Sequence, residues 1–306
     1  MQDRFICPEG VSGRVDKVLA DHYQDFSRAF IKQSIEQGEV TYADGSVLVP
    51  KSKIHPGDAL LVSLVRPKIE ELIPYKYNLS VLYEDEHLLV IDKKPGMVVH
   101  PGDGTDGKTL VHALLHHCGS NLSPIGAPLR PGIVHRLDKE TSGVMVVAKS
   151  ELAHLSLLDQ FVSRKTAKIY KAIVCRKLEG QGEYKQPIGR HPTVRVKMAV
   201  CEKGKPAWTK WKSLKVMRDQ FSYIECEIMT GRTHQIRVHL SSAGHPLAGD
   251  KTYGYKANKS DEPISRVMLH ACKLSFEHPE TSQKLEFSAP LPTDFQQCLK
   301  RLEEDR

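Results

Sequence analysis

Residues 135–150 read HRLDKETSGVMVVAKS, in which a turn of charged side chains runs directly into an apolar, strand-like stretch. Thr141, Ser142 and Gly143 follow the charged residues, and they offer hydroxyl and backbone N–H groups that can hold a carboxylate at a fixed angle. Two interpretations of this segment alone remain open. Asp138 is a reactive carboxylate, or Arg136 and Asp138 form a structural ion pair.

A second segment, GRTHQIRVH at residues 231–239, supplies the cation that a buried carboxylate needs. It follows a predicted strand and opens a helix, with Thr233 as the expected N-cap, so Arg237 lies one turn into that helix. A carboxylate that stays ionised inside a protein requires such a positively charged partner. We therefore expect Arg237 to lie against Asp138.

The rest of the chain contains more strand-like than helical segments, and the two kinds do not alternate regularly. This pattern favours an α+β fold with a mixed, mainly antiparallel sheet. A strand–turn–strand unit is predicted over residues 81–96, further strands over 143–149, 168–175, 208–217, 221–229, 268–278 and 284–289, and helices over 109–118, 150–165, 233–244 and 293–304.

The first part of the chain has the pattern of a separate small module. Val15, Val18 and Leu19 recur at helical spacing, and a second helix is expected between Ser27, its N-cap, and Gly38. Small strands should follow these two helices. The sequence thus predicts a compact unit that is too small for an elaborate active site.

Turn signals define the rest of this module and its end. Asp44-Gly45 predicts a hairpin between Val40 and residues 47–49, and residues 59–64 are a further apolar strand. We expect domain boundaries at residues 12–66 for the small module, 67–79 for a linker that contains proline and mixed charge, and 80–306 for the larger domain.

The positive charge of the chain is unevenly distributed. The 306 residues carry a net charge of +7, but residues 1–66 hold 8 Lys and Arg against 9 Asp and Glu, whereas residues 130–218 hold 20 against 7. Such an excess favours a polyanionic partner, because neutralising phosphates and releasing their counterions dominates nucleic-acid affinity. A solvated basic surface explains the composition equally well.

Several protein classes are disfavoured by composition. No apolar run approaches the roughly 20 residues that cross a bilayer, and the start of the chain lacks the pattern of a secretion signal. The seven cysteines are odd in number and show no CxxC pairing, so we expect reduced thiols in the cytoplasm. Cys226, Cys272 and Cys298 are interpreted as small buried side chains rather than as metal ligands.

Residues 102–109 match the phosphate-loop pattern G-x-x-x-x-G-K-[ST]. Asp103 and Asp106 would place two carboxylates where the loop must cradle anionic phosphates, and Pro101 removes an N–H donor. A phosphate-loop nucleotide hydrolase is therefore the weakest alternative.

A histidine-rich helix raises the question of a metal. His112, His116, His117 and Cys118 fall close together, with no acidic residue or CxxC pair to support coordination. Packed or solvated histidines are favoured, and we expect no metal.

Five segments together carry a resemblance to a known family. The chain resembles the RluA family of RNA pseudouridine synthases from about residue 12 to 292. Residues 189–200 and the N-terminal module are similar to its RluD-like branch, which acts on large-subunit ribosomal RNA. The segments are HRLDKETSG (135–143), GRTHQIRVHL (231–240), KIYKAIV (168–174), GHPLAGDKTYG (244–254) and IDKKPGMVVHPG (91–102).

The resemblance implies a role for individual residues. Asp138 matches the catalytic aspartate, the nucleophile toward a flipped-out uridine, at either the ribose or the base. Tyr170 matches the tyrosine that stacks on the base, and Arg237 matches the arginine paired with the aspartate. Arg136 matches the residue that fills the gap left by the extruded nucleotide. His135 and Arg232, in the same motifs, are expected to contact RNA as well.

The small module resembles the alpha-L RNA-binding domain of ribosomal proteins, the S-four type. The matching positions are Arg14, Asp16, Leu19, Ser27-Arg28, Gly38-x-Val40 and Gly57-Asp58. The resemblance implies RNA contacts from Arg14, Lys17, Arg28 and Lys32.

The expected activity is thus isomerisation of uridines to pseudouridine in large-subunit (23S) ribosomal RNA, without a cofactor. The expected partner is a hairpin loop of that RNA, free or within an assembling large subunit, and the expected state is a cytoplasmic monomer without membrane association. A non-catalytic RNA-binding ribosome-assembly factor with the same fold is the other alternative.

Overall fold

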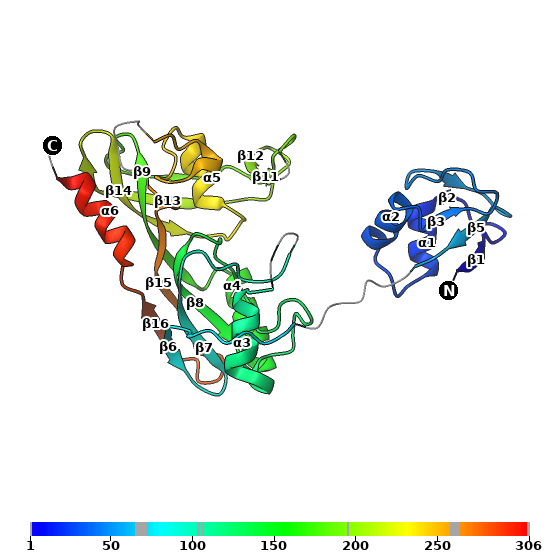
Figure 1. The fold of residues 1–306 in the computed structure, drawn as a ribbon, viewed down its shortest axis with the longest axis horizontal. Helices are drawn as coiled ribbons and strands as arrows, with labels where there is room; N and C mark the ends of the chain where they lie inside the picture. The colour runs from blue at the N-terminus through cyan, green and yellow to red at the C-terminus, as the bar shows by residue number, and fades with distance from the viewer. Residues whose placement is uncertain are drawn as a thin grey trace. The chain divides into compact units, whose positions relative to one another are not determined.

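A computed structural model describes residues 2–64, 72–102, 105, 107–194, 196–257 and 264–304. The chain divides into two compact units, Met1–Glu70 and Glu71–Arg306. Figure 1 shows the elements of each unit. Part of the expected linker, residues 67–71, lies outside the described residues, as do Asp103 and Asp106 of the phosphate-loop match.

The first unit packs two helices on a small sheet. Ser27 accepts a hydrogen bond from the Phe30 N–H, which confirms it as the N-cap of the second helix. The side chains of Val15, Leu19 and Ile31 are fully buried in its core. The helices are α1 (Val15–His22) and α2 (Arg28–Glu36); the strands are β1 (Asp3–Ile6), β5 (Ala59–Val62) and β3 (Val40–Tyr42), in that order across the sheet, and the pair β2 (Gly13–Arg14) and β4 (Lys53–Ile54).

The predicted hairpin at Asp44-Gly45 is wrong in its second strand. β3 pairs with β5 instead of with residues 47–49, which form no strand. Val47 and Val49 are 86% and 52% exposed, so their β-branched side chains have no core to pack against. The local turn signal was outweighed by the longer apolar strand at residues 59–62.

The second unit is built on one large sheet. Among the described residues, nine strands form this sheet, and every pair in it is antiparallel except β15 with β8. The expected mixed, mainly antiparallel α+β class is confirmed. Along the sheet the order is β10 (Gln181–Tyr184), β13 (Thr209–Met217), β14 (Phe221–Ile228), β9 (Ala167–Cys175), β15 (Leu269–Glu277), β8 (Ser142–Ala148), β7 (Leu88–Lys93) and β6 (Val81–Glu84), with β16 (Lys284–Ser288) also paired to β15.

Four helices and two short 3-10 turns are described in this unit. They are α3 (Leu110–Cys118), α4 (Glu151–Val162), α5 (Gln235–Ser242) and α6 (Thr293–Glu303), with η1 (Gly119–Asn121) and η2 (Lys251–Tyr253). A separate hairpin, β11 (Ile188–Arg190) with β12 (Met198–Val200), was not predicted. None of the described helices has the length and apolar character that crossing a bilayer requires.

The N-cap prediction for α5 is wrong. His234, not Thr233, precedes the first helical residue, and its backbone is left-handed with φ 57°. The Arg232 N–H donates a hydrogen bond to Oε1 of Gln235, the first residue of α5, so a helix side chain binds the loop that leads into the helix. The left-handed turn shifts the start of the helix by one residue without moving Arg237 out of its first turns.

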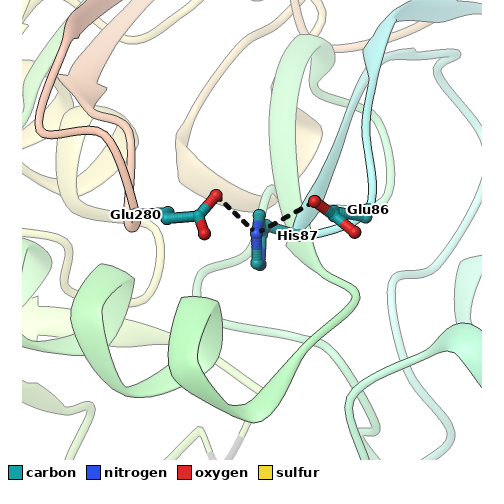
Figure 2. Close-up of side chains that lie close together, drawn as sticks. All are labelled: Glu86, His87 and Glu280. Atoms are coloured by element: carbon teal, nitrogen blue, oxygen red, sulfur yellow. Dashed lines mark ion pairs between the residues drawn. The ribbon is translucent and has the colours of Figure 1, made fainter.

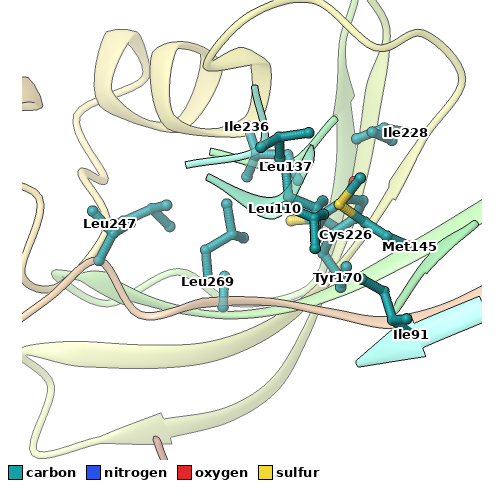
Figure 3. Close-up of a cluster of buried hydrophobic side chains, with 14 of the residues drawn as sticks. Ile91, Leu110, Leu137, Met145, Tyr170, Cys226, Ile228, Ile236, Leu247 and Leu269 are labelled. Carbon is teal, nitrogen blue, oxygen red and sulfur yellow. The ribbon is translucent and has the colours of Figure 1, made fainter. Parts of the chain in front are cut away.

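The core next to the expected site is a cluster of buried side chains between the sheet and helices α3 and α5. Leu137, which precedes Asp138, is 4% exposed and packs in this cluster with residues such as Leu110 and Ile236 (Figure 3). Burial of a leucine side chain contributes about 1.5–3 kcal/mol. Packing of Leu137 in the core therefore holds the turn that carries Asp138 in place.

Gly143 allows β8 and β15 to lie close together. It has φ +117°, and a Cβ atom at this position would lie 2.1 Å from the backbone oxygen of Ala271. Gly143 pairs with Ala271 in the one parallel ladder of the described sheet. Glycine is thus required where the strand leaves the Asp138 turn.

Candidate active site

Asp138 lies in the turn that leads into β8, with its side chain 18% exposed. The backbone oxygen of Asp138 accepts a hydrogen bond from the Thr141 N–H at 3.1 Å, which closes the turn. The next backbone oxygen, that of Lys139, accepts from the Gly96 N–H at 2.8 Å and from the Lys93 ammonium at 3.3 Å. The carboxylate is therefore presented by a backbone with little freedom.

Arg237 contacts Asp138 as expected. Its Nη1 donates to Asp138 Oδ2 at 3.1 Å, across 99 residues of sequence. The Arg237 side chain is 9% exposed. Burial opposes its charge, but the bonds to Asp250 and Asp138 outweigh burial and raise the pKa of the guanidinium. The cation is permanently charged beside the carboxylate.

Asp250 is one of three site residues that were not predicted from the sequence, together with His234 and Tyr253. Arg237 donates to both of its carboxylate oxygens, from Nε at 2.7 Å and from Nη2 at 3.0 Å. Asp250 is 1% exposed and also caps η2, because its side chain accepts a hydrogen bond from the Tyr253 N–H. A buried guanidinium has five N–H donors, which one carboxylate cannot satisfy. The need for a second acceptor was the signal in the sequence that could have predicted Asp250.

His234 and Tyr253 complete the surroundings of Arg237. The Arg237 guanidinium lies 4.9 Å from the centre of the Tyr253 ring. His234 Nδ1 is 2.8 Å from the Tyr253 hydroxyl, and its Nε2 is 3.8 Å from Asp138 Oδ1. Burial lowers the pKa of His234, although the charge of Asp138 opposes this shift. A neutral imidazole therefore faces the carboxylate.

A cavity of about 380 Å³ opens beside Asp138. This volume is within the range of about 300–1,000 Å³ typical of small-molecule sites. Tyr170, on β9, lines it together with Leu269 and Ile228. One acidic side chain, Asp138, meets five basic ones among its lining residues: Arg136, Arg164, Lys168, Arg232 and Arg237. An anionic, partly apolar ligand such as a nucleotide matches these walls.

Tyr170 is 8% exposed and belongs to the same core cluster as Leu269. Burial raises the pKa of its hydroxyl, and the nearby charge of Asp138 adds to this effect. The tyrosine is therefore neutral, and its ring forms a wall between the core and the cavity.

The other three residues expected to contact RNA, Arg136, Arg232 and His135, differ in their exposure and in the groups that they bind. Arg136 is exposed at the cavity, with Nη1 3.4 Å from His100 Nε2. Arg232 also lines the cavity but is held by the Pro206 backbone oxygen at 3.0 Å. His135 Nε2 accepts the Val146 N–H at 3.0 Å, and burial lowers its pKa to about 3. A neutral, occupied His135 offers no charge to a phosphate.

The basic residues expected to bind RNA in the first unit are partly neutralised. Arg14 and Arg28 both bind the buried carboxylate of Asp16, at 2.9 and 3.0 Å. Lys32 is 3.7 Å from Glu36. Arg14 and Lys17 line a cavity of about 460 Å³ in this unit. The two arginines therefore present their remaining N–H groups in fixed positions rather than as free charges.

The histidine-rich helix α3 has local structural roles. His112 is buried, and its Nδ1 accepts from the Thr109 N–H at 3.3 Å in a capping box. His117 is 2.8 Å from Glu84. Thr109, the last residue of the phosphate-loop match, is the N-cap of α3. Its backbone and side chain therefore bind the first turn of this helix.

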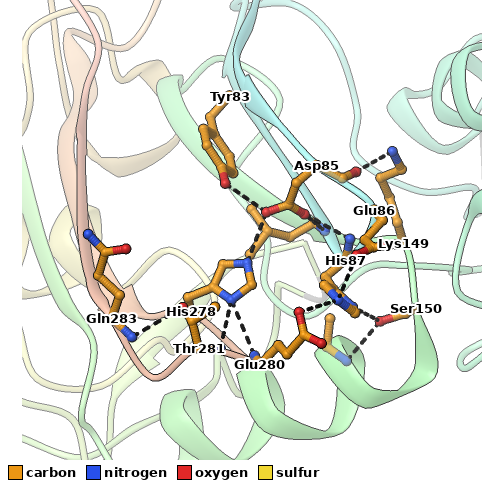
Figure 4. A network of polar contacts seen from close by, with 12 residues as sticks. Tyr83, Asp85, Glu86, His87, Lys149, Ser150, His278, Glu280, Thr281 and Gln283 are labelled. Atoms are coloured by element: carbon orange, nitrogen blue, oxygen red, sulfur yellow. Dashed lines mark hydrogen bonds and ion pairs between the residues drawn. The ribbon is translucent and has the colours of Figure 1, made fainter.

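Elsewhere, a polar network ties the β6–β7 turn to the β15–β16 turn (Figure 4). His278 Nδ1 accepts the N–H groups of Glu280 and Thr281, so its Nε2 donates to Asp85 at 2.9 Å. Backbone and side-chain donors outweigh burial and lower the pKa of Asp85 to about 2. The network fixes two turns far apart in sequence.

Within this network, Glu86 and Glu280 lie on either side of His87 (Figure 2). Among the described residues this is the one group of three ligand-type side chains whose atoms come within 4.8 Å of each other. Glu280 is 2.9 Å from His87 Nε2, and the two glutamates are 84% and 56% exposed. Contacts of two exposed carboxylates with one imidazole account for the arrangement.

The fold and the site together indicate a class of protein: an enzyme with a carboxylate–arginine pair beside an electropositive cavity. A family model described as RNA pseudouridylate synthase matches residues 87–242. "Uncharacterized RNA pseudouridine synthase" of Aquifex aeolicus (strain VF5) is 40% identical over 303 residues, covering 97% of this chain and 96% of that protein.

Further relatives agree with this match. "Ribosomal large subunit pseudouridine synthase D" of Zymomonas mobilis subsp. mobilis is 40% identical, covering 96% of this chain and 95% of that protein. Human RNA Pseudouridylate Synthase Domain Containing 1 has a similar structure, with a TM-score of 0.57 and 28% identity over 74% of this chain and 94% of that chain. The chain belongs to the RNA pseudouridylate synthase family, and the expected RluD-like membership of the RluA group is confirmed.

A pH experiment isolates His135. Its pKa is lowered from 6.5 to about 3 in the folded protein. Between pH 3 and pH 6.5, His135 is therefore protonated in the unfolded chain but not in the folded chain. The resulting stability is present above pH 6.5 and is lost as pH falls toward 3. Urea denaturation at pH 7 and at pH 5 gives the decrease in the free energy of unfolding between these two pH values. We expect this decrease to be smaller in His135→Gln than in wild type, by up to about 2 kcal/mol. Equal decreases in the two proteins would contradict a neutral His135.

Proposed function

We propose that this chain converts uridines of large-subunit ribosomal RNA to pseudouridine, with Asp138 as the nucleophile. The contact of Asp138 with Arg237 at 3.1 Å, beside Tyr170 and an electropositive cavity, is the observation that carries the proposal. The RNA target is supported by the relatives that are named ribosomal large subunit pseudouridine synthase D.

Base flipping is the first step of the proposed reaction. The target uridine leaves its stack at a cost of a few kcal/mol, which is smallest in a loop, and enters the cavity. Arg136, exposed at the rim, fills the space it leaves, while Arg232 and Arg164 face the phosphates. A hairpin loop is therefore the proposed form of the substrate.

The chemical steps conserve all atoms. Asp138 attacks the nucleotide, the bond between N1 and the ribose carbon breaks, and uracil turns in place against Tyr170. A bond from ring carbon five to the ribose carbon then forms, and the bond between Asp138 and the nucleotide breaks, which regenerates the carboxylate. Ring carbon five loses its proton, and N1 gains one. Arg237 orients the carboxylate through the hydrogen bond from its Nη1 to Asp138 Oδ2. These steps involve no net redox change and require no cofactor.

We assign residues 80–306 to this reaction and residues 12–66 to additional RNA contact, joined by a linker at 67–79. Arg14, Lys17, Arg28 and Lys32 are the proposed contacts of the small unit. The proposed enzyme works as a cytoplasmic monomer on free RNA or on an assembling large subunit.

A ring-stacking test addresses Tyr170. Tyr170→Leu removes an aromatic face against which a base can stack, a contribution of about 1–3 kcal/mol. We expect kcat/KM to fall by about 5- to 150-fold, measured by release of tritium from uridine carbon five. Tyr170→Phe keeps the ring and serves as the matched control. A phenylalanine variant as slow as the leucine variant would show that the hydroxyl, rather than the ring, is required.

The substrate class is tested with purified protein and unmodified RNA. Large-subunit RNA, small-subunit RNA and transfer RNA are incubated separately, as naked transcripts and, for the large subunit, as assembling particles. Carbodiimide labelling then maps the product. Pseudouridine should form in the large-subunit samples only. Formation in transfer RNA alone would overturn the proposed target, and absence of product from every sample would favour a non-catalytic assembly factor.

A further inference from the structure

The turn after Asp138 is held by residues from the far end of the chain. The Glu140 backbone oxygen accepts a hydrogen bond from Arg266 Nη1 at 3.1 Å. The Glu140 side chain in turn accepts the Val267 N–H at 3.0 Å. Two contacts, 126 and 127 residues apart in sequence, thus attach the turn to the segment before β15.

Arg266 is itself fixed. Its side chain is 8% exposed, and Nε and Nη2 donate to the two carboxylate oxygens of Asp294 at 2.5 and 2.9 Å. Nη1 also donates to the Val267 backbone oxygen at 2.9 Å. A guanidinium bound at both edges of its plane has a defined position and orientation, which a flexible ammonium would not have.

Asp294 belongs to the first turn of α6, the C-terminal helix in Figure 1. Its Oδ1 accepts the Phe295 N–H at 2.8 Å, which orients the carboxylate. Phe295, Cys298 and Leu302 are buried in a separate hydrophobic cluster, so apolar packing holds the helix in place. The Arg266–Asp294 pair is therefore an addition to the packing of α6 rather than its main support.

We infer that Arg266 is a positioning residue for the nucleophile and that Asp294 fixes Arg266, so that α6 helps to orient Asp138; this rests on the proposed function. Arg266 is not among the residues that line the cavity, so it acts through the backbone of Glu140 and not on the substrate. A misplacement of about 1 Å at a reacting group can cost about 100-fold in rate. Loss of the pair should therefore lower kcat more than it alters KM.

The test compares two ion pairs of the same helix. Asp294→Asn weakens the pair with Arg266, whereas Glu303→Gln breaks the contact of Glu303 with Lys215 on β13 at 3.1 Å, which does not reach the Asp138 turn. We expect Asp294→Asn to lower kcat by about 10- to 100-fold with KM within about twofold of wild type. Glu303→Gln should keep wild-type kcat, and melting curves should show both variants folded.

Two conservative variants separate positioning from a general loss of structure. Arg266→Lys keeps the positive charge but loses the planar guanidinium that binds both oxygens of Asp294. We therefore expect its kcat to fall as far as that of Asp294→Asn. Asp294→Glu keeps the carboxylate and should recover part of kcat, and it carries the test if Asp294→Asn does not fold. Wild-type kcat in Asp294→Asn, or an equal fall in Glu303→Gln, would overturn the inference. Failure of the proposed function is distinct, because wild type would then form no pseudouridine.

Discussion

Asp138→Asn is expected to lower kcat for pseudouridine formation by about 10⁴-fold or more, the scale seen when a catalytic nucleophile is removed. Asparagine has nearly the same shape, but its amide is not a nucleophile. The turn should keep its backbone bonds, and Arg237 keeps its two bonds to Asp250. Melting temperature and RNA affinity should therefore stay close to those of wild type.

Asp159→Asn is the matched control, because it removes one negative charge from an exposed position on α4. Its kcat should equal that of wild type in the same tritium-release assay. If Asp138→Asn turns over at a rate near wild type, the assignment of the nucleophile is wrong. If it fails to bind RNA, its low activity would report lost binding instead of lost chemistry.

Arg237→Met should damage both stability and turnover. It leaves Asp250, which is 1% exposed, without the cation that contacts both of its oxygens. Breaking a buried ion pair by removal of one partner costs about 3–5 kcal/mol. Urea denaturation should show a loss of this size, and the remaining folded protein should lose most of its turnover because Asp138 is no longer oriented.

Arg237→Lys distinguishes the two effects. Lysine keeps the charge but cannot donate to Asp138 and to both oxygens of Asp250 in one plane. We expect much of the stability to return and turnover to remain low. Wild-type stability in Arg237→Met would contradict the buried three-residue arrangement of Asp138, Arg237 and Asp250.

Much of this arrangement could be predicted from local sequence. The expected strands over residues 168–175 and 221–229 are present because their apolar alternation matches a half-buried sheet. The contact of Asp138 with Arg237 is present, and it could be predicted because a carboxylate next to a core needs a cationic partner. The role of each residue in the reaction remains a proposal.

The missed features depend on contacts that local sequence does not encode. Asp250 binds Arg237 through a loop whose course is set by the packing of the whole unit. The left-handed backbone of His234 and the exposed residues 47–49 are likewise decided by tertiary context. His135 is polar in a functional motif, yet a backbone N–H from β8 occupies it. Hydrogen-bonding partners that are distant in sequence can be identified only from the three-dimensional structure.

We propose above all that Asp138 drives pseudouridine formation in large-subunit ribosomal RNA. The most direct measurement uses a strain that lacks this gene and carries either the wild-type or the Asp138→Asn copy, expressed to equal levels. Carbodiimide labelling maps pseudouridine across the large-subunit RNA of each strain. Marks absent from the deletion strain should return with the wild-type copy and stay absent with Asp138→Asn. Return of the marks with Asp138→Asn would contradict this mechanism.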